Sequence, residues 1–210
     1  MIYLSVPPVT MDHRALVEAS KLGVMLTPRV GRSVASASAW PIWAADNGCF
    51  SAAQSFDLAV YLAWLDRMRV VSGCLFATAP DVVGDAAATW ERSREVLPAL
   101  RALGYCAALV IQDGISCVEW HEIDAVFIGG STDFKFSHAA NDVLLEAKSR
   151  GLWAHMGRVN SWRRWERCAA AGYDSCDGTF LAFGPDLNLP RVRGWLALDK
   201  QIHFDFAGAR

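Results

Sequence analysis

The sequence has no apolar run that approaches the roughly 20 residues of a transmembrane helix. Its first eight residues contain no Lys or Arg, so we expect no signal peptide and a cytoplasmic protein. The six cysteines form no C-x2-C pair, and no histidine lies at zinc-finger spacing from them. We therefore expect no metal site and no cofactor, and we interpret the cysteines as buried thiols in a reducing compartment.

Two nucleotide-binding signatures are also missing. No G-x-G-x-x-G follows the first apolar segment, and the chain has no P-loop, so the usual signs of dinucleotide binding and nucleotide hydrolysis are absent. There is no excess of basic residues either, because the formal net charge is −2 and the pI is about 6.2. This balance excludes a chain that is polybasic overall, but it leaves room for a basic groove on one face.

The composition is that of an ordinary globular protein. The chain has 210 residues, of which 53% are hydrophobic and 20% charged. A chain of this length buries about 70% of the surface that its unfolded form exposes, so it folds without disulfides or metals. No low-complexity segment or internal repeat marks a boundary, and we expect residues 1–210 to form a single domain.

Short apolar segments alternate with amphipathic ones along the chain. Helices with one apolar face are predicted at 57–70, 85–103, 141–150 and 161–171. Eight short apolar runs are typical of buried strands, and they lie at 2–6, 24–26, 42–45, 73–77, 107–111, 125–128, 152–155 and 173–176.

This alternation predicts an α/β protein with a parallel sheet covered by helices. Eight strands indicate a closed (β/α)8 barrel of the TIM type, and at about 26 residues per unit it must be compact, with some short or missing helices. We expect one short helix between residues 6 and 24 and none between 26 and 42. A doubly wound open sheet is the alternative.

Polar residues and glycines follow six of the predicted strands. In a parallel barrel these strand ends share the rim where active sites lie, so three carboxylates and an amide should converge beside glycines that let a ligand approach the backbone. Asp, Asn and Gly are also common turn residues, and it is the repetition of the pattern that favours a site. The segments are DNG at 46–48, TAPD at 78–81, QDG at 112–114, GGST at 129–132, MGR at 156–158 and DGT at 177–179.

Some residues near these strand ends have a structural interpretation as well. We interpret His155 as a buried strand-end histidine in preference to a base, and Cys49 and Cys176 as packing residues. Trp162 and Trp165 are expected in the core, with stacking on nucleic-acid bases as the alternative.

The same strand ends resemble, in the same order, the motifs of the tRNA-guanine transglycosylases. Residues 46–50 (DNGCF) resemble the D-[ST]-G-G-[FY]-Q segment of that family, and 111–114 (IQDG) resemble V-Q-G-G. Residues 128–130 (IGG) are similar to G-G-L, 155–157 (HMG) to L-M-G-V-G, and 172–177 (GYDSCD) to G-[IV]-D-x-F-D.

The resemblance is closer to the shorter DNA-modifying branch, the DpdA-type transglycosylases of phages and bacterial islands. The segments that resemble this branch are PDVV at 80–83, FIGGS at 127–131 with a nearby lysine, GRVNS at 157–161 and DSCDGT at 174–179.

The resemblance implies a (β/α)8 barrel that exchanges guanine for a 7-deazaguanine base such as preQ0. Asp177 matches the family nucleophile, which would attack C1′ of the nucleotide, and Asp46 matches the general acid/base. Asp174 also matches a family aspartate and is the rival nucleophile, although its place within the predicted strand disfavours it. Further positions that the resemblance assigns to the base site are Asp81, Gln112, Gly129, Gly130, Ser131, Met156, Gly157 and Asp174.

The departures from the tRNA enzymes favour DNA as the substrate. The family's C-x-C-x2-C…H zinc segment after the nucleophile has no counterpart here, and Asn47 and Cys49 differ from the first motif. We expect base flipping or a single-stranded substrate, because a duplex hides the guanine edge and C1′. Salt-sensitive contacts to the nucleic acid are expected from Arg158, Asn160, Lys135, Arg163 and Arg164.

Three other functions stay open at this point. The chain could act on tRNA by the same chemistry, it could be a silent barrel that binds nucleic acid or a base, or it could be an unrelated barrel enzyme that acts on a sugar. A helper protein or a homodimer is compatible with all of them.

Overall fold

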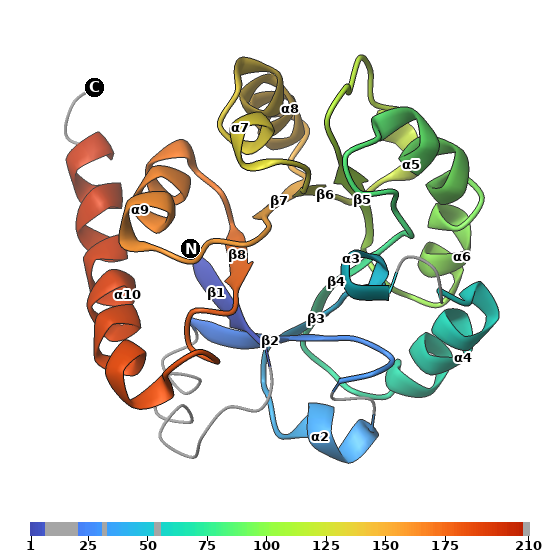
Figure 1. The fold of residues 1–210 in the computed structure, drawn as a ribbon, viewed down its shortest axis with the longest axis horizontal. Helices are drawn as coiled ribbons and strands as arrows, with labels where there is room; N and C mark the ends of the chain where they lie inside the picture. Colours follow the sequence, from blue (N-terminus) through green and yellow to red (C-terminus); the bar gives the residue numbers. More distant parts are fainter. Residues whose placement is uncertain (7–20, 31–32, 53–55, 208–210) are drawn as a thin grey trace.

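The computed structural model describes residues 1–6, 21–30, 33–52 and 56–207. Its centre is a closed barrel of parallel strands in sequence order, in which β8 pairs with β1 (Figure 1). The predicted (β/α)8 barrel is therefore confirmed. The strands are β1 (Ile2–Ser5), β2 (Leu22–Leu26), β3 (Trp43–Ala45), β4 (Cys74–Thr78), β5 (Ala107–Ile111), β6 (Ala125–Ile128), β7 (Trp153–Met156) and β8 (Ser175–Gly178).

Helices surround the barrel, and several are short, as the length of the chain requires (Figure 1). Between β5 and β6 there is a single 3-10 turn, η3 (Trp120–Glu122), in place of a helix. The helices in the described segments are α2 (Val34–Ser38), α3 (Cys49–Ala52), α4 (Leu58–Met68), α5 (Ala86–Ser93), α6 (Leu97–Ala102), α7 (Thr132–Lys135), α8 (His138–Ser149), α9 (Trp162–Ala171) and α10 (Pro185–Ala207).

Side chains of alternating size fill the inside of the barrel. Leu4, Met25 and Phe76 pack there with three alanines, and Phe127 and Trp153 lie against this cluster. A second, larger core lies between the strands and the helices. Successive strand residues point to these two cores in turn, so a shift of one residue decides whether a side chain faces the barrel or the helices.

Helix ends follow the local sequence. The Asp57 side chain accepts a hydrogen bond from the Val60 amide at the start of α4, and Ser161 accepts one from Arg164 at the start of α9. The αL conformation of Gly172, with φ 90°, ends α9. These ends lie within a few residues of the predicted ones.

Three predicted segments were wrong. The helix expected at 85–103 is broken into α5 and α6, because Pro98 lies in the first turn of a new helix. The stretch between β2 and β3 contains α2, where no helix was expected. Strand β8 begins two residues later than predicted, so Asp177 lies inside it. The short helix expected between residues 6 and 24 falls largely on residues 7–20, outside the described residues.

Helix α10 was not predicted, and it packs beside α9 (Figure 1). Trp165 is fully buried there, 6.4 Å from the ring of Trp195, and Trp162 stacks on Trp165 at 5.3 Å. Trp165 therefore belongs to the core, as expected, whereas Trp162 is only partly buried and packs against it. No helix in the described part of the chain is both long and apolar enough to cross a membrane.

All six cysteines are free thiols. Cys49, Cys168 and Cys176 are buried as predicted, but Cys106 and Cys117 are exposed and Cys74 is partly exposed. The prediction of buried thiols was therefore wrong for Cys74, Cys106 and Cys117. Cys106 and Cys117 lie in segments that connect helices and strands.

Candidate active site

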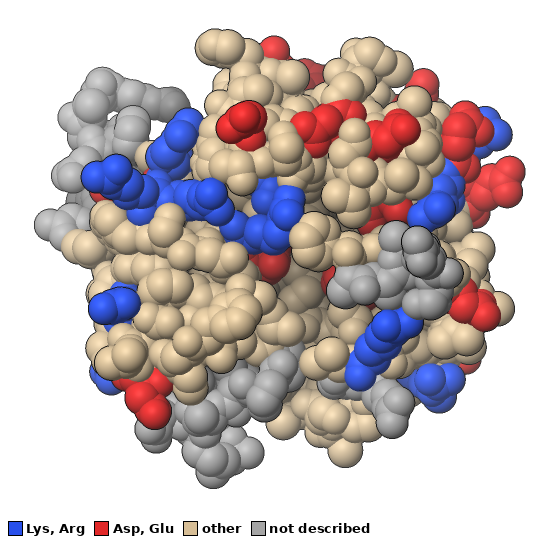
Figure 2. Space-filling view, in the orientation of Figure 1, with Lys and Arg blue, Asp and Glu red and all other residues tan. Residues whose placement is uncertain are grey.

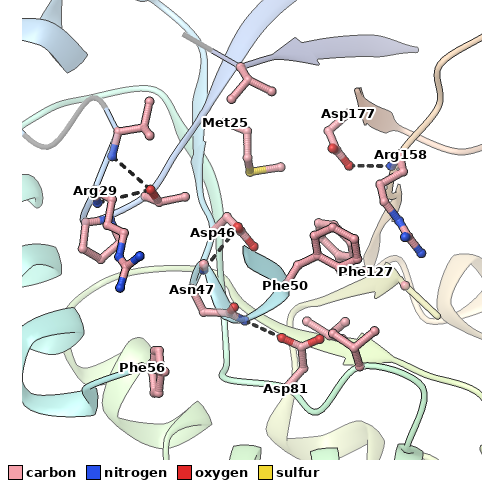
Figure 3. Close-up of a pocket in the computed structure, with 18 of the residues that line it drawn as sticks. Met25, Arg29, Asp46, Asn47, Phe50, Phe56, Asp81, Phe127, Arg158 and Asp177 are labelled. Carbon is pink, nitrogen blue, oxygen red and sulfur yellow. Dashed lines mark hydrogen bonds between the residues drawn. The ribbon is translucent and has the colours of Figure 1, made fainter. Parts of the chain in front are cut away.

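A cavity of about 820 Å³ opens at the carboxyl ends of the strands, where barrels of this kind hold their active sites. Figure 2 shows the hollow at the centre of this face of the molecule. Three aspartates line it, each from a different strand end: Asp46 after β3, Asp81 after β4 and Asp177 in β8 (Figure 3). The predicted convergence of three carboxylates and an amide, Gln112, is confirmed.

Asp177 is held through one of its two carboxylate oxygens. Its Oδ1 lies 3.1 Å from Nε2 of His155 and accepts a hydrogen bond of 3.0 Å from the backbone amide of Arg158. The side chain is 16% exposed, and the exposed part faces the cavity. This carboxylate is positioned rigidly and remains open to a ligand.

Asp46 has an environment that favours the protonated acid. Burial raises its pKa to about 7, and the negative charges of Asp177 and Asp81 contribute in the same direction. The amide of Gly48, which donates a 3.2 Å hydrogen bond to Oδ2, only partly opposes this. A carboxyl group with a pKa near neutrality is suited to give and take protons.

Asp81 is the centre of a buried network of amides. Asn47 donates to its Oδ1 at 3.1 Å (Figure 3), and Gln112 donates to its Oδ2 at 2.6 Å. Burial raises the pKa of Asp81, whereas these two hydrogen bonds lower it. The Oε1 atom of Gln112 is itself fixed by the amide of Gly84 at 2.9 Å. The network holds acceptor and donor groups in fixed directions at one side of the cavity.

Arg158 closes another side of the cavity with a left-handed backbone. Its φ is 58°, and among the described residues it is the one non-glycine with a positive φ. This conformation directs the Arg158 amide at Asp177, while the guanidinium donates to the carbonyl of Gly130 and lies 4.7 Å from the Phe50 ring. A strained residue of this kind at a cavity indicates a functional constraint.

The mouth of the cavity is mainly apolar and aromatic. Phe50 is 62% exposed, and Phe56, Val83 and Phe127 line the same space. Apolar walls with a few fixed polar groups are typical of sites for small, flat ligands. The arrangement sets carboxyl and amide groups with fixed directions against apolar walls, so it can bind a ligand that has both polar and apolar parts.

Several residues assigned to the base site do line the cavity, and others do not. Gly129 and Gly130 line it together with Asp81 and Gln112. Gly130 has a φ of 73°, which suits glycine. The remaining assignments need correction, and each correction has a simple geometric reason.

Asp174 lies at the opposite end of the barrel. It precedes β8, pairs with Lys148 at 2.7 Å and accepts a hydrogen bond from the Ala154 amide at 2.8 Å. Its assignment to the base site was wrong, because β8 starts only at Ser175 and Asp174 lies before its amino end.

Met156, Ser131 and Gly157 are not among the residues that line the cavity. The Met156 side chain points to the helix layer, opposite to its strand neighbour His155. Ser131 is the N-cap of α7 and bonds Asp113. The Gly157 carbonyl accepts a 2.7 Å hydrogen bond from Lys135.

Lys135 is also unsuited to its predicted role on the nucleic acid. It is 6% exposed, and burial lowers its pKa to about 8. Its ammonium group supports the loop that carries Arg158, so it acts inside the protein. Asn160 does line the cavity, where its Oδ1 accepts a 2.8 Å hydrogen bond from the Thr179 amide.

A basic band leads to the cavity from α9. Arg163 and Arg164 are the second and third residues of α9, which begins four residues after Arg158 of the cavity lining. Figure 2 shows Lys and Arg side chains over this part of the surface up to the edge of the hollow, whereas acidic side chains gather over α5, α7 and α8. The local basic surface that the net charge left open therefore exists beside the candidate site.

Sequence reasoning missed two contributors to the site. Asn47 was noted only as a departure from a motif, yet it holds Asp81. His155 was correctly interpreted as a buried, hydrogen-bonded histidine, but its contact with Asp177 was not foreseen. Its place two residues before Gly157, at a strand end of the rim, was the available signal.

No protein-family model matches the chain, and no curated protein matches it. No cluster of three or more His, Cys, Asp and Glu side chains that could hold a metal ion is found among the described residues. What the structure defines is a parallel eight-stranded barrel with a carboxylate-lined cavity at the usual catalytic end.

Proposed function

We propose that the chain is a transglycosylase that exchanges guanine in DNA for a 7-deazaguanine base. The observation that carries the proposal is the pairing of two unlike carboxyl groups, Asp177 and Asp46, across one cavity. Asp177 is held by N–H donors, and Asp46 has a pKa of about 7. Pairs of carboxyl groups in unlike environments serve as nucleophile and general acid/base in retaining glycosyl transfer.

In the first half of the reaction, Asp177 attacks C1′ of the guanosine nucleotide. A bond forms between C1′ and a carboxylate oxygen, while the C1′–N9 bond breaks and its electron pair leaves with the base. Protonated Asp46 gives its proton to the departing guanine. The result is a covalent ester between Asp177 and the nucleotide.

In the second half, the incoming 7-deazaguanine reverses these steps. Asp46, now ionised, takes the proton from N9 of the new base, and N9 attacks C1′. The C1′–O bond breaks, and its electron pair returns to Asp177. A group with a pKa near neutrality performs both transfers without a large energetic penalty in either direction.

The network around Asp81 supports recognition of a guanine edge. A carboxylate can accept from the N1–H and N2–H2 groups of guanine, and the Gln112 amide has a second N–H to donate to O6. A 7-deazaguanine carries the same edge, so the two bases compete for one site. The apolar mouth with Phe50 and Phe56 supports stacking of the flat ring.

The basic band on α9 supports a polyanionic substrate. Arg163 and Arg164 lie at the start of α9, outside the cavity lining, and suit phosphate contacts to the strand on either side of a flipped nucleotide. DNA is the proposed polymer on the strength of the sequence resemblance. A tRNA substrate would use the same cavity, so the experiment includes both polymers.

The test is nucleoside mass spectrometry on DNA and tRNA incubated with the purified chain and preQ0. We expect a 7-deazaguanine deoxynucleoside that is absent with Asp177→Ala and still formed with the control Asp113→Asn, whose carboxylate lies outside the cavity lining. A modified ribonucleoside would transfer the proposal to tRNA. If neither polymer is modified and no Asp177 ester is trapped, the proposal is wrong.

A further inference from the structure

A line of hydrogen-bonded side chains leads from the wall of the barrel to Asp177. Nε1 of Trp153 donates to Oγ of Ser175 at 2.8 Å, and the same Oγ lies 2.8 Å from Nδ1 of His155. Nε2 of His155 then lies 3.1 Å from Oδ1 of Asp177. All four residues belong to β7 and β8, the adjacent strands that close this side of the barrel.

With a neutral imidazole and an ionised carboxylate, the direction of every hydrogen bond in this line is defined. An indole N–H can only donate, and an ionised carboxylate can only accept. A neutral imidazole has one N–H, which must therefore be on Nε2 to reach Asp177. Nδ1 is then an acceptor, and the Ser175 hydroxyl donates to it while accepting from Trp153.

The surroundings of His155 keep the imidazole neutral. Its ring is fully buried and packs between Phe76, 5.0 Å away, and Phe127, 4.5 Å away. Burial lowers the His155 pKa, with the positive charge of Lys135 as a smaller contribution, against the opposing effect of Asp177. Among the described residues, no other charged group contributes to this lowering of the His155 pKa.

The two oxygens of Asp177 are consequently unlike each other. Oδ1 receives both N–H groups, from His155 and from the Arg158 backbone. Oδ2 has no hydrogen bond to any of the residues that the structure describes. One oxygen is anchored, and the other is left for a ligand in the cavity.

We propose that His155, oriented by Ser175 and Trp153, is a positioning residue that anchors Oδ1 of Asp177 and presents Oδ2 to C1′ of the substrate. This inference rests on the proposed function, in which Asp177 is the nucleophile. The sequence resemblance does not supply it, because the matching family segment has a leucine where this chain has His155.

The anchored oxygen matters in both halves of an exchange. When Oδ2 forms its bond to C1′, Oδ1 becomes the carbonyl oxygen of the ester and keeps both N–H donors. When the new base attacks C1′, the C1′–Oδ2 electron pair returns to the carboxylate, and the same donors stabilise the returning charge. Because His155 stays neutral, it can donate the same hydrogen bond to Oδ1 in both half-reactions.

The first experiment determines the tautomer of His155, and with it the direction of the hydrogen bonds, in the absence of substrate. We expect ¹⁵N NMR of histidine-labelled protein to show His155 as the neutral Nε2–H tautomer between about pH 6 and 8, close to its ordinary titration range. In Ser175→Ala the Nδ1 resonance should shift, because its donor is gone. An Nδ1–H tautomer or an imidazolium in the wild-type chain would overturn the inference whether or not base exchange occurs.

The second experiment measures ester formation in a single turnover. His155→Phe should lower its rate roughly 10- to 100-fold with little change in the polymer concentration that gives half the maximal rate, because Asp177 loses its orientation while the contacts that bind the polymer remain. His155→Gln keeps an N–H near the Nε2 position and should recover most of the rate, and Ser175→Ala should lie between the two.

These outcomes separate the two proposals. A rate in His155→Gln as low as in His155→Phe would show that packing, and not the N–H donor, is what His155 contributes, and the inference would be wrong. Trp153→Phe, which removes the N–H at the far end of the line, should change the Nδ1 resonance less than Ser175→Ala. Absence of exchange in the wild-type chain would reject the proposed function, and the tautomer would still decide the direction of the hydrogen bonds.

Discussion

Asp174 and Asp177 are three residues apart in the chain, yet their side chains serve opposite ends of the barrel. Asp174 is paired with Lys148 at 2.7 Å, before β8 begins, whereas Asp177 lines the cavity at the carboxyl end of the same strand. A strand rises about 3.3 Å per residue, so three residues suffice to separate the two ends. Of the two candidate nucleophiles, only Asp177 is in a position to meet a ligand in the cavity.

We expect substitutions of these two aspartates to have different effects. Asp177→Asn should abolish the covalent ester, since an amide is not a nucleophile for C1′. Asp174→Asn should keep ester formation and lower the free energy of unfolding by about 0.5–1 kcal/mol, because its ion pair with Lys148 is partly exposed. Intact-mass measurement of the trapped ester and urea unfolding check the two effects. An ester that persists in Asp177→Asn and disappears in Asp174→Asn would reverse the assignment.

In the proposed exchange, the pKa of Asp46 sets the pH dependence of the first half-reaction. Ester formation requires protonated Asp46, so its rate should fall about tenfold per pH unit above pH 7. Asp46→Asn should remove this dependence and lower the rate roughly 10²- to 10⁴-fold. Single-turnover rates between pH 6 and 9 provide the measurement. A wild-type rate that stays constant over this range would exclude Asp46 as the acid.

The same pKa predicts an effect on stability. The folded chain holds a proton on Asp46 up to about pH 7, whereas the unfolded chain releases it near the ordinary pKa of an aspartate, 3.8. The folded state therefore binds more protons between these values, and stability falls as the pH rises through this window. At pH 8, Asp46→Asn should raise the free energy of unfolding by about 1–3 kcal/mol, with no gain at pH 4. Thermal unfolding at both pH values tests this, and an equal change at both would contradict it.

Two substitutions of Arg158 separate the effect of its backbone conformation on stability from the effect of its side chain. Arg158→Gly relieves the positive φ of 58° and keeps the amide that donates to Asp177, whereas Arg158→Ala retains the strain. We expect the glycine variant to be more stable than the alanine variant by about 1 kcal/mol. Both lose the guanidinium contacts to Gly130 and Phe50. Urea unfolding of the pair measures the difference, and equal stabilities would show that the backbone is not strained.

The basic band predicts a salt dependence of DNA binding. Replacing Arg163 and Arg164 by alanine should weaken binding and reduce the slope of log K against log salt concentration by about 1 for each lost phosphate contact. Arg101→Ala removes the same charge elsewhere, where Arg101 pairs with Asp124 at 2.8 Å, and should leave the slope unchanged. Fluorescence anisotropy at several salt concentrations is the measurement. Equal slopes for all variants would remove α9 from the interface.

Much of the fold follows from local patterns in the sequence. The apolar runs are too short for core helices, and the segments between them have the period of an amphipathic helix. This alternation favours a parallel sheet that is covered by helices. Where the pattern failed, distant contacts decided the outcome. Helix α10 has a weakly amphipathic sequence interrupted by Pro190, and it is stabilised by packing of Trp195 against α9. The break between α5 and α6 depends on Pro98, which a periodicity argument passes over.

The features of the candidate site can likewise be separated into those that the sequence predicts and those that depend on distant contacts. By itself, the sequence determined which residue types follow the strands, and therefore that Asp46, Asp81, Gln112 and Asp177 share one rim. It did not determine which side chains face the cavity, because neighbouring strand residues such as His155 and Met156 point to opposite faces, and because the later start of β8 leaves Asp174 before the amino end of the strand. Only the tertiary structure decided that Asn47 and Gln112 hold Asp81 and that His155 holds Asp177. These pairs lie about 20–35 residues apart in the chain, and closure of the barrel brings them within hydrogen-bonding distance.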